Sequence, residues 1–349
     1  MSIIPFRAPG PAAAVRPLGP VDQGTGRGGP GLGTMAGLGV LAGLSSALVA
    51  LIGQARLATR SIEAAAVEAA LADGTLVPLP VPGGTRAQQR LADHLVHVRL
   101  PQGEGIYAPD GTRIATLHDA VRDDAEQPLT LAMLGDSTSV GYGTLTADDL
   151  PGVILARGIA AQLGRRVRMR SHGLTGARTT DLTRQLELCL ADPPDVVVVL
   201  IGANDMRDMV PPSRSAALLG EATAALRARG IPVVAGTCPD FGVIAAIPQP
   251  LRSFLGTFSL RLAALQQRAV TEAGGSAVAL AQLVSPQFRG NPDMFARDRF
   301  HPSGAGYGRA MAVLLPAAIE ELEKAAGTAA GSPKDTAQAV PDHLHPLSA

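Results

Sequence analysis

Residues 129–143, with the sequence LTLAMLGDSTSVGYG, decide how this chain folds. The stretch begins with an apolar run that ends at Gly135, which is typical of a central strand buried in a parallel sheet. Ser137 follows this run, so we expect it just beyond the carboxyl end of the strand. Ligands of open α/β sheets bind in the crevice beyond those strand ends. The stretch therefore predicts a serine hydroxyl in a binding crevice, and a turn serine that caps the next helix is the alternative interpretation.

A second apolar run leads to a candidate amide. Residues 195–200, DVVVVL, form the clearest buried-strand pattern in the chain, and Asn204 follows soon after it. Asn204 is therefore also expected at the carboxyl end of a strand, where ligands of such sheets bind. The alternative is a turn asparagine that hydrogen-bonds its own backbone.

One histidine stands beside an acid near the end of the chain. Asp298 precedes His301 by three residues, and in a helical turn this spacing puts both side chains on one face. A carboxylate beside an imidazole suits a base and the group that orients it. Asp342 and His345 repeat the spacing, but they lie in a polar, proline-bearing tail with no element to fix them. The other five histidines have no acid three residues before them and are interpreted as structural or solvated.

Strand and helix patterns alternate from residue 129 onward, which predicts a parallel sheet covered by helices on both faces. The expected strands are 129–135, 166–171, 195–201, 231–236 and 277–283. The expected helices are 151–163, 179–190, 213–229, 257–273 and 303–326.

Four short motifs occur in a fixed order: GDS at 135–137, GLTG at 173–176, GAND at 202–205 and DRFH at 298–301. Together they resemble the four sequence blocks of the SGNH hydrolases, in the GDSL esterase and lipase family. The resemblance covers residues 129 to 326. The second block departs from the family pattern, because it lacks the asparagine often found before its glycines.

The resemblance implies an α/β fold of the flavodoxin-like type, a three-layer α/β/α sandwich with a five-stranded parallel sheet. It also implies a serine esterase or lipase that cleaves an acyl ester through an acyl-serine intermediate, without a cofactor or metal. Ser137 would be the nucleophile, His301 the base and Asp298 its orienting acid. The oxyanion hole would consist of the backbone N–H groups of Ser137 and Gly176 and the side-chain amide of Asn204. Asp136 and Asp205 are interpreted as residues that hold loops.

Other functions remain open at this point. The same site could pass the acyl group to a sugar or lipid acceptor, as an acyltransferase, or could remove acetyl groups from carbohydrate. An inactive, membrane-tethered binding module is a hypothesis of a different class. A nucleotide-binding domain is disfavoured, because no strand is followed by a glycine-rich phosphate loop.

Composition excludes one class of partner. The formal net charge is zero, the isoelectric point is near 7.1, and no dense basic stripe is present, so nucleic acid is not expected to bind. The hydrophobic fraction of 46% is ample for a buried core. Cys189 and Cys238 lack the spacing of a structural zinc site, and two free core thiols are favoured over a disulfide.

An uncharged run of residues, 35–53, is long enough to cross a bilayer as a helix, and a single membrane anchor is the favoured interpretation. A signal-peptide core and a buried helix of a soluble fold are the alternatives. Arginines are nearly balanced on the two sides of the run, so its orientation in the membrane stays open.

The remaining segments carry weaker patterns. Residues 1–34 and 327–349 are expected to be disordered, and residues 54–127 to form a helical stalk and lead-in to a hydrolase domain at 128–326. Within the lead-in, helices are expected at 55–73 and 86–98.

Overall fold

The computed structural model describes residues 101–114 and 127–331, and before them residues 50, 53–62, 64–69, 72–73, 76–78 and 96–98. The segment at 1–34, the end of the chain after residue 331 and the uncharged run 35–53, apart from residues 50 and 53, lie outside the described residues. The membrane anchor therefore stays a prediction. Within the described part of the chain, no helix combines the length and the apolar character that a bilayer span needs.

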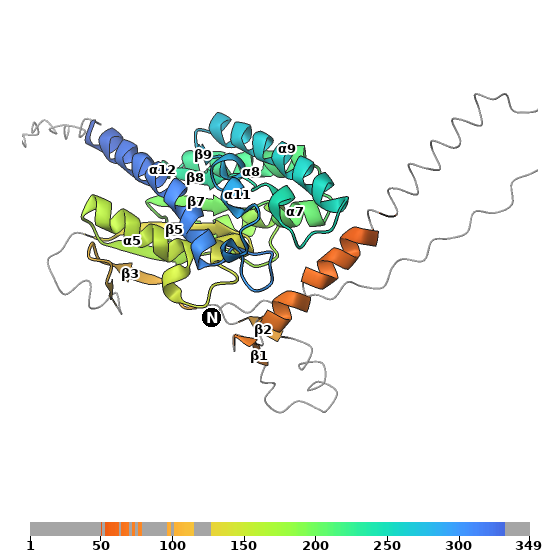
Figure 1. Cartoon of the computed structure of the whole chain (residues 1–349). Helices are drawn as coiled ribbons and strands as arrows, with labels where there is room; N and C mark the ends of the chain where they lie inside the picture. The colour runs from red at the N-terminus through yellow and green to blue at the C-terminus, as the bar shows by residue number, and fades with distance from the viewer. Residues whose placement is uncertain are drawn as a thin grey trace, which may run out of the picture.

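A seven-stranded sheet forms the centre of the fold, in the order β4-β3-β6-β5-β7-β8-β9 (Figure 1). Its five parallel strands are β5 (Leu129–Gly135), β6 (Val167–Ser171), β7 (Val196–Leu200), β8 (Val233–Gly236) and β9 (Ser276–Val278). Two further strands, β3 (Gly105–Tyr107) and β4 (Arg113–Ile114), form an antiparallel hairpin on the edge of β6. The expected α/β class is confirmed, but the expected number of five strands is wrong, because β3 and β4 are too short to show a periodic pattern.

Helices cover both faces of this sheet and complete the three-layer sandwich (Figure 1). One face carries α5 (Pro151–Leu163) and α12 (Gly304–Gly331), and the other carries α6 (Leu182–Leu190) and α8 (Pro212–Arg227), on which α9 (Leu251–Glu272) packs. Successive side chains of a strand point to opposite faces. Leu131 and Met133 of β5 therefore join the core with α5 and α12, while Ala132 and Leu134 join the core with α6 and α8.

The two cysteines are buried and free, as the sequence favoured. Cys189 on α6 belongs to one core cluster and Cys238 after β8 belongs to the other. The sheet lies between them, which explains why they form no disulfide.

Two expected elements near the C-terminal end differ in the structure. The strand expected at 277–283 ends at Val278, and a short helix, α10 (Leu280–Leu283), follows it, because a short apolar run suits either element. The last helix continues to Gly331 instead of ending at 326, so residues 327–331 are helical instead of disordered. A single helical glycine costs only about 1 kcal/mol, and the alanine-rich sequence around Gly327 favours helix.

The lead-in segment also differs from expectation. Residues 96–98, expected at the end of a helix, form strand β2 (Val96–Val98), which pairs with β1 (Leu76–Pro78). The rest of that expected helix lies outside the described residues. The helix expected over 55–73 is present as residues 53–62 and 64–69. Its Gln54 side chain donates to the backbone oxygen of Gln249 at 2.8 Å, which joins this helix to the start of α9.

Candidate active site

The nucleophile turn begins at Gly135, the last residue of β5. Gly135 has a φ of +131°, and a Cβ atom there would lie 1.9 Å from the backbone oxygen of Leu200, so only glycine lets β5 end this close to β7. Asp136 then caps the short helix α4 (Ser137–Val140) by accepting a hydrogen bond from the backbone nitrogen of Thr138 at 2.9 Å. The turn holds Ser137 as the first residue of α4, at the carboxyl edge of the sheet.

Two buried glutamines hold the backbone at this edge. Gln185 of α6 accepts from the nitrogen of Gly135 at 2.7 Å and donates to its oxygen at 2.9 Å. Gln266 of α9 accepts from the nitrogen of Cys238 at 2.7 Å and donates to the oxygen of Ile201 at 3.0 Å. Neither glutamine could be identified from the sequence, because a lone glutamine in a helix gives no signal of burial.

The structure brings Ser137, His301 and Asp298 together. The Nε2 atom of His301 lies 3.1 Å from the Oγ atom of Ser137, and its Nδ1 atom lies 2.6 Å from the Oδ2 atom of Asp298. Asp298 is buried, and its Oδ1 atom accepts from the backbone nitrogens of Phe300 and His301. These contacts link the hydroxyl to the imidazole and the imidazole to the carboxylate.

The local geometry of Asp298 and His301 corrects the expectation of a helical turn. Residues 298–301 form a bend in which the aspartate oxygen bonds the backbone two and three residues onward, and Arg299 has a φ of +57°. The spacing of three residues brings the two side chains together through this aspartate turn.

Electrostatics keep Asp298 ionised. Burial alone would raise the pKa of Asp298, but the hydrogen bond and the charge of His301, with the two backbone hydrogen bonds, outweigh it and lower that pKa below its ordinary value. An ionised carboxylate at this place accepts from Nδ1 of His301 and leaves Nε2 free to face Ser137.

Aromatic rings enclose the imidazole. The ring of Tyr142 lies 4.4 Å from that of His301, centroid to centroid, and the ring of Phe300 lies 5.2 Å away, edge to face. Burial raises the pKa of Tyr142 to about 12, so this side chain stays neutral. Tyr307 donates from its hydroxyl to the backbone oxygen of Tyr142 at 2.8 Å. No sequence pattern pointed to Tyr142, although it lies within residues 129–143.

The segments that carry Gly176 and Asn204 are bonded to each other. Asn204 lies in the first turn of α7 (Ala203–Arg207), and its Nδ2 atom donates to the backbone oxygen of Ala177 at 2.9 Å. The loop before Gly176 is fixed to the nucleophile turn, because the nitrogen of Leu174 donates to the oxygen of Gly135 at 3.0 Å. Gly176 has a φ of +81°, and a Cβ atom there would meet no atom within 4 Å.

Asp205 also bonds α7 to the segment that follows Gly176, which agrees with its expected role of holding loops. Its Oδ2 atom accepts from both the backbone nitrogen and the hydroxyl of Thr179, at 3.0 and 2.7 Å. Burial raises the pKa of Asp205, and these hydrogen bonds oppose that rise. Its Oδ1 atom is buried and has no hydrogen-bond partner among the described residues.

Asp136 gives the site a pH-dependent stability. Burial raises the pKa of Asp136 from 3.8 to about 6, against the opposing hydrogen bonds from Thr138. The folded chain therefore binds this proton more tightly than the unfolded chain does. The free energy of unfolding should fall by about 2 kcal/mol through this group as the pH rises from about 4 to about 6.

The variant Asp136→Asn should lack this loss, because asparagine has no carboxyl proton and keeps an oxygen that accepts from Thr138. Urea unfolding at about pH 4 and about pH 7 measures the effect. The stability of the variant relative to the wild type should be about 2 kcal/mol more favourable at the higher pH. An equal difference at both pH values would contradict the raised pKa.

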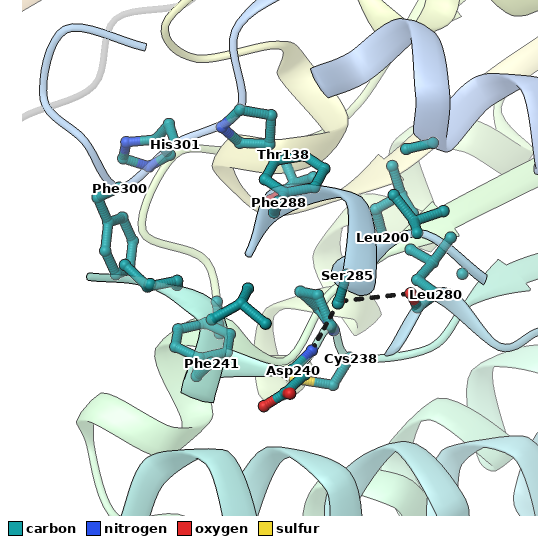
Figure 2. Close-up of a pocket in the computed structure, with 18 of the residues that line it drawn as sticks. Thr138, Leu200, Cys238, Asp240, Phe241, Leu280, Ser285, Phe288, Phe300 and His301 are labelled. Carbon is teal, nitrogen blue, oxygen red and sulfur yellow. Dashed lines mark hydrogen bonds between the residues drawn. The ribbon is translucent and has the colours of Figure 1, made fainter. Parts of the chain in front are cut away.

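An apolar pocket of about 110 Å³ adjoins Ser137 and His301 (Figure 2). Within the described residues, no group of three or more His, Cys, Asp or Glu side chains is arranged to hold a metal ion.

Known proteins resemble this chain over the region that holds the site. A model of the GDSL-like lipase/acylhydrolase family matches residues 133–309, which include all five candidate site residues. A GDSL-like esterase of Mycobacterium tuberculosis is 40% identical over 225 residues, which cover 64% of this chain and 70% of that protein.

Solved structures with a similar fold include a lipase/acylhydrolase from Enterococcus faecalis, with a TM-score of 0.42 and 21% identity over 57% of this chain and 97% of the other. A catalytic variant of an acetylxylan esterase from Geobacillus stearothermophilus has a TM-score of 0.41 and 20% identity, over 57% of this chain and 96% of the other.

Proposed function

The chain belongs to the GDSL-like lipase/acylhydrolase family, which makes it a carboxylic ester hydrolase, and we propose that it works through an acyl intermediate on Ser137. Two contacts carry the proposal. The Oγ atom of Ser137 lies 3.1 Å from Nε2 of His301, and Nδ1 of His301 lies 2.6 Å from Oδ2 of Asp298. Both separations lie within the reach of a hydrogen bond that a nucleophile and its base require.

The proposed reaction has two steps. His301 takes the hydroxyl proton of Ser137 at Nε2 while the serine oxygen attacks the ester carbonyl carbon, and His301 then returns that proton to the leaving alcohol as the ester C–O bond breaks. A water molecule attacks the acyl-serine in the second step, with its proton going to His301 and then to the serine oxygen. The products are an alcohol and a carboxylic acid. Asp298 stabilises the imidazolium that forms in each step.

The negative charge of the tetrahedral intermediates needs hydrogen-bond donors. We assign them to the backbone N–H groups of Ser137 and Gly176 and to the Nδ2 group of Asn204, following the family resemblance. The hydrogen bonds between these segments support the assignment, because donors that are fixed before the reaction stabilise developing charge without reorganisation.

Hydrolysis can be separated from the other hypotheses by its products. The purified chain should convert a short p-nitrophenyl ester into equal amounts of acid and p-nitrophenol in buffer without any acceptor. If free acid appeared only in trace amounts and the acyl group went to an added sugar or lipid, an acyltransferase would replace the hydrolase. If the chain turned over no ester, the hypothesis of an inactive binding module would remain.

A further inference from the structure

The pocket beside Ser137 is lined by Ser137 and His301 and extends into the fold. Leu200, Leu280 and Ala310 line it together with these two residues. Figure 2 shows His301 and Phe300 on one side of the pocket and Leu200 and Leu280 on the opposite side. Leu200, Leu280 and Ala310 are at most 9% exposed, so the wall that they form is buried.

Ala310 joins the pocket wall to the last helix of the chain. It lies on α12, which begins at Gly304 directly after the His301 segment, and a helix rises 1.5 Å per residue. Ala310 is therefore about 9 Å along α12 from its first residue. The same helix packs against β8 and β7, the strands that carry Gly236 and Leu200.

The wall of the pocket is apolar and aromatic. Its large side chains come from the segment after β8, from α11 (Ser285–Phe288) and the residue before it, and from the loop before His301: Phe241, Val243, Ile244, Val284, Phe288 and Phe300. These side chains offer no hydrogen bonds to sugar hydroxyls.

Two polar side chains of the wall, those of Ser285 and Asp240, are already bonded within the protein. The Oγ atom of Ser285 accepts from the nitrogen of Asp240 at 3.0 Å and donates to the oxygen of Leu280 at 3.4 Å (Figure 2). The Oδ1 atom of Asp240 accepts from the nitrogen of Gly242 at 2.7 Å. Burial raises the pKa of the Cys238 thiol, so it stays uncharged.

From this pocket of about 110 Å³ we infer that the esterase selects an apolar acyl group of about four to six carbons, since a cavity of roughly 150 Å³ holds one benzene molecule. The inference rests on the proposed function and names its substrate class. A buried apolar wall suits the acyl part, because the acyl group stays bonded to Ser137 while the alcohol must leave and water must enter.

Chain-length kinetics test the inference. We would measure kcat/KM with p-nitrophenyl acetate, butanoate, hexanoate and dodecanoate. Each buried methylene should raise kcat/KM by about fourfold until the pocket is full, so butanoate should exceed acetate about fifteenfold, and dodecanoate should fall below hexanoate. Highest activity with acetate or with dodecanoate would overturn the inference.

Two variants change the pocket in opposite directions. The larger side chain of Ala310→Leu fills part of the pocket and should lower the ratio of hexanoate to acetate kcat/KM at least tenfold. Val284→Ala removes two methyl groups from the wall and should raise the same ratio, which keeps the test decisive if the larger side chain impairs folding. The matched control Ala312→Leu lies on the exposed face of α12 and should keep the wild-type ratio.

The outcomes separate the two proposals. Equal chain-length profiles for Ala310→Leu, Val284→Ala and the control would overturn the acyl pocket while leaving ester hydrolysis intact. The same holds if the variants change selectivity among ethyl, butyl and hexyl acetates instead, because the pocket would then hold the alcohol. A wild-type chain that cleaves none of these esters would overturn the proposed function itself.

Discussion

Replacing Ser137 by alanine should lower kcat for a p-nitrophenyl ester by about 10⁴-fold or more, because no other group in the site can form the acyl intermediate. Substrate should still bind, since the apolar wall of the pocket is unchanged. The measurement is steady-state kinetics on the variant, purified with care to exclude traces of wild-type enzyme.

Ser139→Ala is the matched control for this prediction. Ser139 lies on the same short helix and is also buried, but its hydroxyl donates to the backbone oxygen of Asp136 at 2.8 Å. We expect the control to keep more than about a tenth of the activity, because a backbone hydrogen bond of this kind contributes only about 1 kcal/mol. Equal activity of Ser137→Ala and wild type would exclude the acyl-serine mechanism.

Replacing Asn204 by alanine should lower kcat by about 10²- to 10³-fold with little change in KM, because one donor to the oxyanion is lost and that donor acts mainly on the transition state. Some loss of position of the Gly176 loop is expected as well, since Asn204 also bonds the oxygen of Ala177. The kinetic constants are measured with the ester that gives the highest wild-type rate.

The control for Asn204 is Asp208→Asn, at the end of the same helix. Asp208 forms an ion pair with Arg207, and both side chains are partly exposed, so its neutralisation should change kcat by less than about threefold. A loss that appeared in KM alone would contradict the assigned role of Asn204, because it would place the amide in substrate binding.

Local patterns sufficed to predict four of the five parallel strands to within about two residues, while the fifth, expected at 277–283, is a strand only over Ser276–Val278. The apolar runs that became β5 and β7 are buried at every residue, and such runs identify central strands without any knowledge of the partners. The order of the four motifs predicted which side chains the sheet edge brings together. The structure places Ser137, His301 and Asp298 in contact as this order implied.

Features that depend on distant contacts were not predictable. The hairpin of β3 and β4 forms only because β6 offers a free edge, and its strands are two and three residues long. Gln185 and Gln266 have roles that exist only once α6 and α9 pack beside the strand ends. Asp298 and His301 were correctly paired but with the wrong backbone geometry, since a spacing of three residues suits both a helical turn and an aspartate turn.

The proposed mechanism requires that His301 activate the hydroxyl of Ser137. The most direct measurement treats the folded chain with a fluorophosphonate and identifies the modified peptide by mass spectrometry. We expect a single phosphonate on Ser137 and none after His301→Ala or Ser137→Ala. Labelling of a different residue, or undiminished labelling of Ser137 in His301→Ala, would contradict it.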